Sequence, residues 1–158
     1  MPVSENGVVY FYTSFVVPPE GENYAELMAV NPDGKGDIAG TNIIWRIKTP
    51  VLQLSTPVVK DGLLYTVDSE NNLICIEATT GQTIYSEKLK AKFNSSPVYA
   101  NANIYFCSIR GEIIIIKESL EYERIAVNKL DGEIWSTPAI LRNSILIRTS
   151  KYLYRIGD

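Results

Sequence analysis

The sequence predicts an all-β fold: a β-propeller segment whose blades are four-stranded antiparallel sheets. First, a Ser/Thr-Pro motif recurs, with Pro57, Pro97 and Pro138 spaced 40 and 41 residues apart. Second, short apolar runs separated by Asn, Asp and Gly fill each interval, as expected for strands joined by hairpin turns. Third, no stretch of useful length has the periodicity of an amphipathic helix. A repeat of about 40 residues with four strands is typical of propeller blades.

The elements of one repeat follow in a fixed order. A short strand begins after each proline and ends in a tight turn, at 60–62, 101–103 and 142–144. The Asn, Asp and Gly residues of these turns tolerate positive φ. Second strands are expected at 63–67, 104–107 and 145–147, and third strands at 73–76, 113–116 and 153–156. Fourth strands follow at 83–89 and 124–129, so the last repeat lacks this element.

Both faces of each sheet are expected to be buried. The third strands 73–76 and 113–116 are apolar at successive positions, whereas a strand with one wet face alternates. Burial contributes about 1.5–3 kcal/mol for each large apolar side chain. The sequence therefore predicts that neighbouring sheets stack on one another, and that this stacking supplies most of the stability.

One stretch of the second repeat, C-I-E-A-T-T-G-Q-T-I-Y, resembles the repeat signature A-x-D-x-x-T-G-x-x-x-W of the PQQ-like, or quinoprotein-type, β-propeller family. Thr80 and Gly81 match the signature, while Cys75, Glu77 and Tyr85 stand for its Ala, Asp and Trp. The resemblance implies that the aromatic residue docks onto a glycine-containing turn of the neighbouring blade.

Residues 29–46 resemble an expanded version of the first repeat, and the resemblance continues through 136–138 to the ending 153–157, so it covers nearly the whole chain. It implies one propeller segment, 1–158, of about three and three-quarter blades. The expected blades are 2–54, 55–94, 95–135 and an incomplete 136–158. Because propellers of this family usually carry more blades, the chain resembles the C-terminal portion of a longer protein or half of a ring.

The incomplete blade leaves an open edge at 152–156, which is expected to invite pairing with another strand. In the family, the closing strand typically comes from the start of the full-length chain. As an alternative, two copies joined head to tail would form a homodimer that completes a ring of about eight blades.

The residue types argue against several function classes. The chain has no histidine, which removes the usual acid–base group and the commonest metal ligand. Its net charge of −3 disfavours nucleic acid as a partner.

Cys75 and Cys107 form no C-x-x-C motif and are expected to be buried free thiols, with a disulfide as the alternative in an oxidising compartment. Segment 31–37 has the spacing of a calcium loop, but Lys35 stands where an oxygen ligand is needed and Asn42 where a bidentate Glu is needed, so a glycine-rich turn is expected.

The expected function is non-catalytic binding or scaffolding, with a protein or a glycan as partner. The dehydrogenases that share the repeat hold their quinone with Ca²⁺ and a pair of adjacent cysteines, which this sequence lacks. Neither a cofactor nor enzymatic activity is therefore expected. The alternatives are a carbohydrate- or polymer-binding accessory domain and a fragment of a PQQ-dependent dehydrogenase.

The same resemblance implies a periplasmic or extracellular location. The apolar segment 8–17 lacks the preceding basic region of a signal peptide and is expected to be a strand. No apolar stretch is long enough to form a membrane-spanning helix.

Candidate contact residues lie in the connections between blades and in the second hairpins, which share one face of a propeller ring. Long connections are where binding residues tend to lie, and exposed Tyr and Trp suit protein or carbohydrate contact. For Trp135, as for Trp45, docking between blades is the alternative role. The candidates are Tyr24, Gln53, Phe93, Asn94, Arg110 and Trp135.

Overall fold

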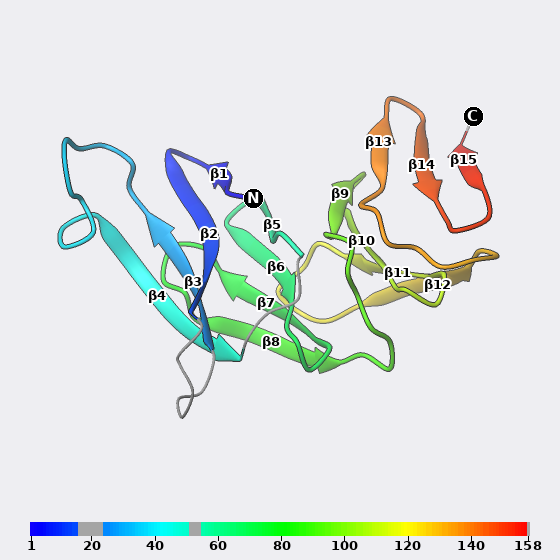
Figure 1. Ribbon diagram of the computed structural model, residues 1–158, viewed down its shortest axis with the longest axis horizontal. Helices are drawn as coiled ribbons and strands as arrows, with labels where there is room; N and C mark the ends of the chain where they lie inside the picture. The colour runs from blue at the N-terminus through cyan, green and yellow to red at the C-terminus, as the bar shows by residue number, and fades with distance from the viewer. Residues whose placement is uncertain (16–23, 51–54, 158) are drawn as a thin grey trace.

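The structure, a computed structural model, describes residues 1–15, 24–50 and 55–157. These residues form four antiparallel sheets that follow one another around an open arc (Figure 1). They contain no helix, and hence none that could cross a membrane. Three sheets have four strands and the last has three, which confirms the predicted fold class.

Each sheet is an up-and-down meander, which we call a blade. The first blade contains β1 (Val3–Glu5), β2 (Val8–Phe15), β3 (Tyr24–Val30) and β4 (Ile43–Pro50). The second contains β5 (Val58–Lys60), β6 (Leu63–Val67), β7 (Asn72–Glu77) and β8 (Thr83–Lys88). The third contains β9 (Val98–Ala100), β10 (Asn103–Cys107), β11 (Glu112–Lys117) and β12 (Arg124–Lys129). The fourth contains β13 (Ala139–Leu141), β14 (Ser144–Arg148) and β15 (Leu153–Gly157).

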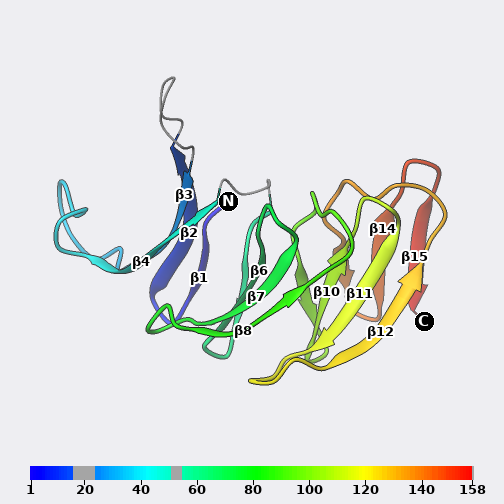
Figure 2. The same ribbon diagram turned by 90° about the horizontal axis from the view of Figure 1, so that it is seen from below.

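The short first strands connect the blades on the inner side of the arc. β1 contacts β5, β5 contacts β9, and β9 contacts β13. Figure 2 shows the sheets standing side by side, so that each inner blade has a neighbour against both of its faces. This is the arrangement that the doubly apolar strands predict.

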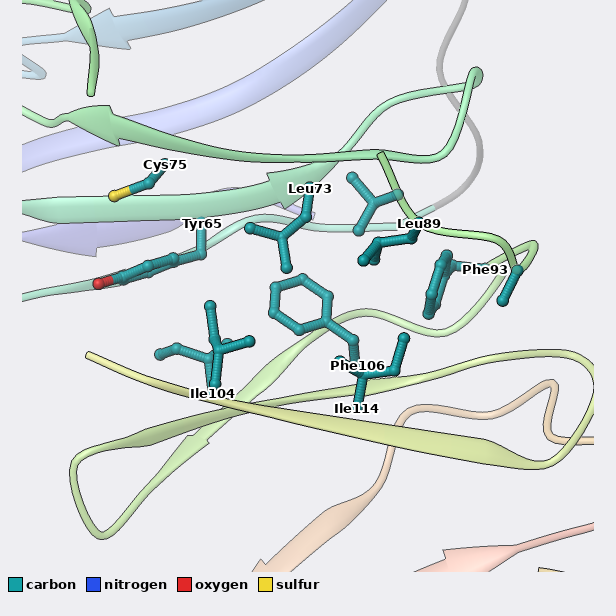
Figure 3. Close-up of a cluster of buried hydrophobic side chains, with 11 residues drawn as sticks. Tyr65, Leu73, Cys75, Leu89, Phe93, Ile104, Phe106 and Ile114 are labelled. Carbon is teal, nitrogen blue, oxygen red and sulfur yellow. The ribbon is translucent and has the colours of Figure 1, made fainter. Parts of the chain in front are cut away.

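The largest apolar cluster lies between the second and third blades (Figure 3). Tyr65 and Leu73 of the second blade pack against Ile104 and Phe106 of the third, and all four are almost fully buried. A second cluster joins the first two blades, and a smaller one joins the third and fourth. The hydrophobic core is therefore distributed over the interfaces between blades.

Both cysteines are buried and free, so the disulfide alternative is not realised. Cys75 lies in the cluster between the second and third blades, and Cys107 in the cluster between the third and fourth. Desolvation by burial raises the pKa of the Cys75 thiol to about 11 and that of Cys107 to about 12. Both thiols are consequently protonated at neutral pH.

Trp45 joins the first blade to the second in the way that the family resemblance implies. Its indole Nε1 donates a hydrogen bond of 2.8 Å to the Ala78 carbonyl oxygen. At Gly81, whose φ is 76°, an added Cβ would lie 2.8 Å from the indole ring, so the ring requires a glycine beneath it. Tyr85 has the corresponding position in the second blade, where its ring packs edge-on against Tyr122 of the third.

The repeated Ser/Thr-Pro motif forms a second link between blades. The backbone N–H of Thr56 donates to Ser96 Oγ (2.8 Å), and the N–H of Ser96 donates to Thr137 Oγ1 (3.0 Å). The amino group of Met1 donates in the same way to Thr56 Oγ1 (3.0 Å). One hydroxyl in each repeat thus accepts a hydrogen bond from the preceding blade.

The first hairpins turn through a left-handed backbone conformation. In the first two blades a glycine takes the second turn position, with φ of 81° at Gly7 and 79° at Gly62. The third blade has Ala102 there, at a φ of 58°. A residue with a Cβ loses about 1–2 kcal/mol in this conformation.

We therefore expect Ala102→Gly to raise the free energy of unfolding by about 1 kcal/mol. Urea denaturation followed by far-UV circular dichroism measures this change. The matched control is Gly62→Ala, which should lower the free energy of unfolding by a similar amount, since an added Cβ at Gly62 meets no other atom within 4 Å. Destabilisation by Ala102→Gly would contradict the assignment of strain to this turn.

We expect Ser96→Ala to lower the free energy of unfolding by about 1 kcal/mol, because the N–H of Thr56 loses its acceptor. The same denaturation measurement applies. Ser86→Ala on the exposed strand β8 is the control and should change stability by no more than about 0.5 kcal/mol. Equal changes in the free energy of unfolding for the two substitutions would show that the hydroxyl link between blades contributes nothing to stability.

Candidate binding face

The connections between blades and the second hairpins meet at one end of the sheets, which we call the connection face. Each blade is an up-and-down meander. The loop after its second strand and the loop after its fourth strand therefore lie at the same end of the sheet. In the described part of the chain, the connection face consists of 55–57, 68–71, 89–97, 108–111, 130–138 and 149–152.

Hydrogen bonds tie the second and third connections to the second hairpins of the blades that they enter. The N–H of Ile109 donates to the Lys92 carbonyl (2.9 Å), and the N–H of Ser150 donates to the Glu133 carbonyl (2.8 Å). Glu133 also donates its own N–H to Ser150 Oγ (3.0 Å). The loops of the connection face are therefore held by backbone bonds to one another.

Two glycines allow these segments to approach closely. An added Cβ at Gly111, where φ is 81°, would lie 2.5 Å from the carbonyl oxygen of Gly132. An added Cβ at Gly132, where φ is 98°, would lie 2.9 Å from Thr149 Oγ1. Side chains at either position would push the third connection away from the hairpins of the third and fourth blades.

Buried polar side chains cap the second hairpins of this face. Asp68 accepts hydrogen bonds from the backbone N–H groups of Glu70 (2.9 Å) and Asn72 (2.8 Å). Ser108 and Thr149 accept corresponding backbone bonds in the third and fourth blades. Asp68 is thus a structural group, as the abundance of Asp in turns predicts.

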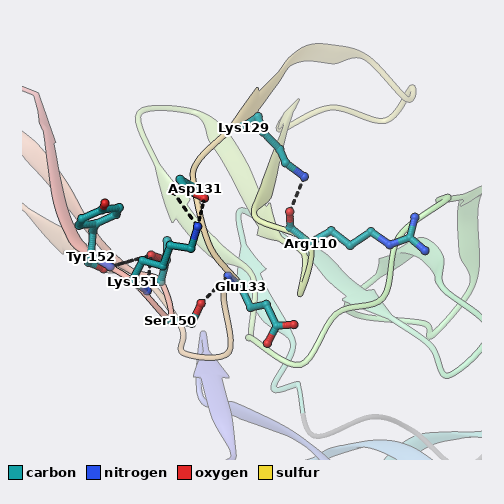
Figure 4. Close-up of polar contacts among 8 residues, drawn as sticks. Arg110, Lys129, Asp131, Glu133, Ser150, Lys151 and Tyr152 are labelled. Carbon is teal, nitrogen blue, oxygen red and sulfur yellow. Dashed lines mark hydrogen bonds and ion pairs between the residues drawn. The ribbon is translucent and has the colours of Figure 1, made fainter.

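Three of the six candidate residues lie on the connection face with exposed or half-buried side chains. Trp135 is 57% exposed, and its Nε1 donates to Glu133 Oε2 (2.9 Å). Arg110 is exposed, and its guanidinium extends away from the other labelled residues (Figure 4). Asn94 is half-buried. Trp135 does not dock between blades, in contrast to Trp45.

The expectation that Phe93 is an accessible contact residue is wrong. Its side chain is 1% exposed and packs edge-on against Phe106, with 6.4 Å between ring centroids (Figure 3). The segment K-L-K-A-K-F alternates charged and apolar residues, so Leu89, Ala91 and Phe93 enter the core while the lysines face outward. This alternation was the sequence signal that could have placed Phe93 in the core.

The other two candidates are Tyr24 and Gln53. Tyr24 begins β3, with Lys48 Nζ 4.2 Å from its ring centroid, a distance suited to a cation–π contact. Gln53 lies outside the described residues.

Asp131, Glu133 and Lys151 are polar residues of this face that the sequence did not single out. Lys151 Nζ lies 2.8 Å from Asp131 Oδ1, which raises the pKa of the ammonium group, and Glu133 fixes the Trp135 indole (Figure 4). Lys129 Nζ donates to the Arg110 carbonyl oxygen. Such exposed pairs set the positions of side chains more than they add stability.

The residues do not fit a quinone and its metal ion. Among the described residues, no group of three Asp, Glu, Cys or His side chains could hold a metal. Cys75 and Cys107 lie in different clusters and do not form an adjacent pair. No catalytic step through such a group is supported.

Comparisons with known proteins agree with the family inferred from the repeat. A family model described as outer membrane protein assembly factor BamB matches residues 25–141. The chain is 22% identical over 114 residues to a protein of that name from Nitrosomonas eutropha, an alignment that covers 71% of this chain and 27% of the relative.

Solved structures of low sequence identity share the fold. The structure of BamB from Moraxella catarrhalis matches with a TM-score of 0.72 at 8% identity, over 98% of this chain and 41% of that chain. A quinohemoprotein alcohol dehydrogenase from Pseudomonas putida HK5 matches with a TM-score of 0.66 at 14% identity, over 92% of this chain and 27% of that chain. This chain spans less than half the length of each of these proteins. Since the family model matches most of the chain, the protein belongs to the PQQ-like repeat family described as outer membrane protein assembly factor BamB.

Proposed function

We propose that this chain is a non-catalytic propeller module that binds a protein partner through its connection face. The observation that carries the proposal is Trp135, an exposed indole held in one orientation by its bond to Glu133. Burying an indole contributes strongly to protein association, and Trp, Tyr and Arg dominate the energetics of such interfaces. Because the loops are tied together before binding, little ordering cost opposes the association.

Other groups on the same face support a protein partner. Arg110 and Tyr152 are exposed on the hairpins of the third and fourth blades, and Asp131 and Lys151 present an ion pair between them. A mixture of aromatic, cationic and acidic groups resembles a protein–protein interface more than a glycan platform. Relatives named as assembly factors support both a protein partner and a periplasmic location for this chain.

The two alternatives have less support. A glycan-binding domain would present stacked aromatic rings along a groove, whereas Trp135 and Tyr152 stand on separate loops of the connection face. A PQQ-dependent dehydrogenase would require a metal and quinone site, which the residues described here do not supply.

Site-specific photocrosslinking tests the proposal. A photoreactive phenylalanine analogue at position 135, in the native cell envelope, should give one discrete adduct whose partner is identified by mass spectrometry as a protein. The matched control places the analogue at Gln82, an exposed turn residue at the opposite end of the second blade, where we expect no adduct. Trp135→Ala should abolish binding of the identified partner while changing stability by no more than about 0.5 kcal/mol.

Equal adducts at the two positions would contradict a specific site at Trp135. Trp135-dependent binding on a glycan array, with no protein adduct, would instead establish the carbohydrate-binding alternative.

We further propose that a second copy of the chain covers the two outer faces of the arc, joined head to tail. The outer face of the first blade has a cavity of about 620 Å³ lined by Phe11 and Met28, with Glu26 beside it. On the outer face of the fourth blade, strand alternation places Leu141, Leu153 and Arg148. Glu26 is paired with Arg46 on this face (3.8 Å), so the contact rests on apolar groups that oppose apolar groups. A rotation can close such a head-to-tail contact into a ring.

Light scattering on a sizing column across a wide concentration range checks this association. We expect a mass near twice 17.7 kDa at high concentration. Leu153→Glu should shift the protein to monomer, because it places a carboxylate in the apolar contact, whereas Ser86→Glu on the exposed strand β8 should leave the dimer intact. A monomer at every concentration would exclude the head-to-tail pair.

A further inference from the structure

Segments 88–97 and 129–138, which contain the second and third connections, correspond residue for residue. Each begins at a lysine whose ammonium group donates to a backbone carbonyl of the second hairpin in its own blade. Each also accepts a backbone N–H from the second hairpin of the next blade, at the Lys92 carbonyl in one segment and at the Glu133 carbonyl in the other. The two segments therefore hold their side chains in equivalent places on the connection face.

The charges in these places differ between the two segments. In the third connection, Asp131 pairs with Lys151 of the fourth blade's hairpin, with 2.8 Å between Oδ1 and Nζ. The residue equivalent to Asp131 in the second connection is Lys90. The residue equivalent to Lys151 in the third blade's hairpin is Arg110. Two cations consequently stand where the next repeat has an ion pair.

These cations are not neutralised within the described part of the chain. Lys90, Lys92 and Arg110 are exposed, and none of them forms an ion pair among the residues described. The Arg110 guanidinium extends away from Asp131 and Glu133, the carboxylates of the next connection (Figure 4). The site therefore offers unpaired positive charge on loops that backbone hydrogen bonds already hold in place.

The neighbouring groups keep this part of the face positive. Lys88 and Lys129 bond to backbone carbonyls, which leaves the charges of their ammonium groups uncancelled. Of the carboxylates at the adjoining hairpins, Asp68 caps its own turn, Glu112 accepts a hydrogen bond from its own hairpin, and Glu70 is exposed. Cations thus outnumber carboxylates here, although the whole chain has a net charge of −3.

We propose that Lys90, Lys92 and Arg110 form a site for the carboxylates of an acidic segment of the partner protein. A carboxylate of that segment takes the role that Asp131 has beside Lys151, and contacts both Lys90 and Arg110. A further acidic side chain binds Lys92. Complementary charge of this kind selects the partner and accelerates its approach. The inference rests on the proposed function, because it names the chemistry of the partner that the connection face binds.

The same face favours a protein segment over an anionic lipid surface. Asp131 and Glu133 lie on the adjacent connection, so a uniformly anionic membrane would meet carboxylates as well as cations. Like charges brought together across an interface are unfavourable. A protein segment can place its acidic groups on the cations alone, and leaves Trp135 free to contact an apolar group of the same partner.

A fluorescently labelled octapeptide that alternates glutamate with serine tests the site, with binding measured by fluorescence anisotropy. We expect saturable binding that Lys90→Asp weakens about tenfold, because the new carboxylate pairs with Arg110 and fills the site. Arg124→Asp makes the same charge change at the opposite end of β12 and should leave binding unchanged. Raising the ionic strength to about 1 M should also weaken binding, since the Debye length falls to about 3 Å.

The converse substitution adds a site. Asp131→Lys gives the third connection the two-cation arrangement of the second, beside Lys151, and should strengthen binding of the same peptide about threefold. A peptide with lysine in place of each glutamate should not bind either protein. Lys90→Asp should not lower the free energy of unfolding, because it replaces two neighbouring cations with an ion pair, and urea denaturation checks this.

Peptide binding that Lys90→Asp leaves unchanged, or that Arg124→Asp weakens equally, would overturn the proposal. Sedimentation of the protein with phosphatidylglycerol vesicles, abolished by Lys90→Asp and without peptide binding, would overturn it in favour of a lipid surface. Trp135→Ala should leave peptide binding unchanged, because the peptide has no apolar side chain. Peptide binding without a crosslink at position 135 would reject the proposed function and leave this site standing. A crosslink at position 135 without peptide binding would do the reverse.

Discussion

Apolar packing between neighbouring sheets is the interaction on which the rest of this structure depends. In the second blade, Tyr65 and Leu73 face the third blade, while Leu64 and Ile76 face the first. A sheet that is apolar on both faces exposes one of them unless it has two neighbours, and burial of each large side chain contributes about 1.5–3 kcal/mol. The blades consequently stabilise one another, as in other repeat architectures, and no single blade has a core of its own.

The three interfaces between blades are built to one plan but are filled to different degrees. Trp45 fills the first with an indole that donates to Ala78, and Tyr85 fills the second together with Tyr122. The third blade has Ala126 at the docking position. At the third interface the buried cluster is small, and a groove of about 1030 Å³ lies between the blades. Close packing requires a partner atom on every side. An interface with a small residue at the docking position therefore loses packing contacts unless another group fills the space. Of the three interfaces, the third therefore has the smallest buried cluster.

The connection face combines rigidity with exposure. Backbone bonds between loops and close passages at Gly111 and Gly132 hold the segments in place. Against this support, Trp135 and Arg110 extend toward solvent. Binding residues on loops that a scaffold has already positioned lose little entropy on association, which is the physical advantage of a propeller as a binding platform.

The sequence by itself determined the repeat, the strands and the family. The spacing of Pro57, Pro97 and Pro138 located the blades, and the Asn, Asp and Gly turns located the hairpins, because these features are local and depend on backbone conformation alone. The docking of Trp45 on Gly81 is a contact between two blades, and the sequence indicated it only through the resemblance of the repeat signature to the family. Tertiary structure decided which side chains are accessible. Phe93 and Trp135 both lie in connections between blades, yet Phe93 is buried against Phe106 while Trp135 is exposed beside Glu133, since exposure depends on which blade packs over a connection. The groove beside β15 was hidden from the sequence because it arises from side chains of two blades that meet only in the folded chain.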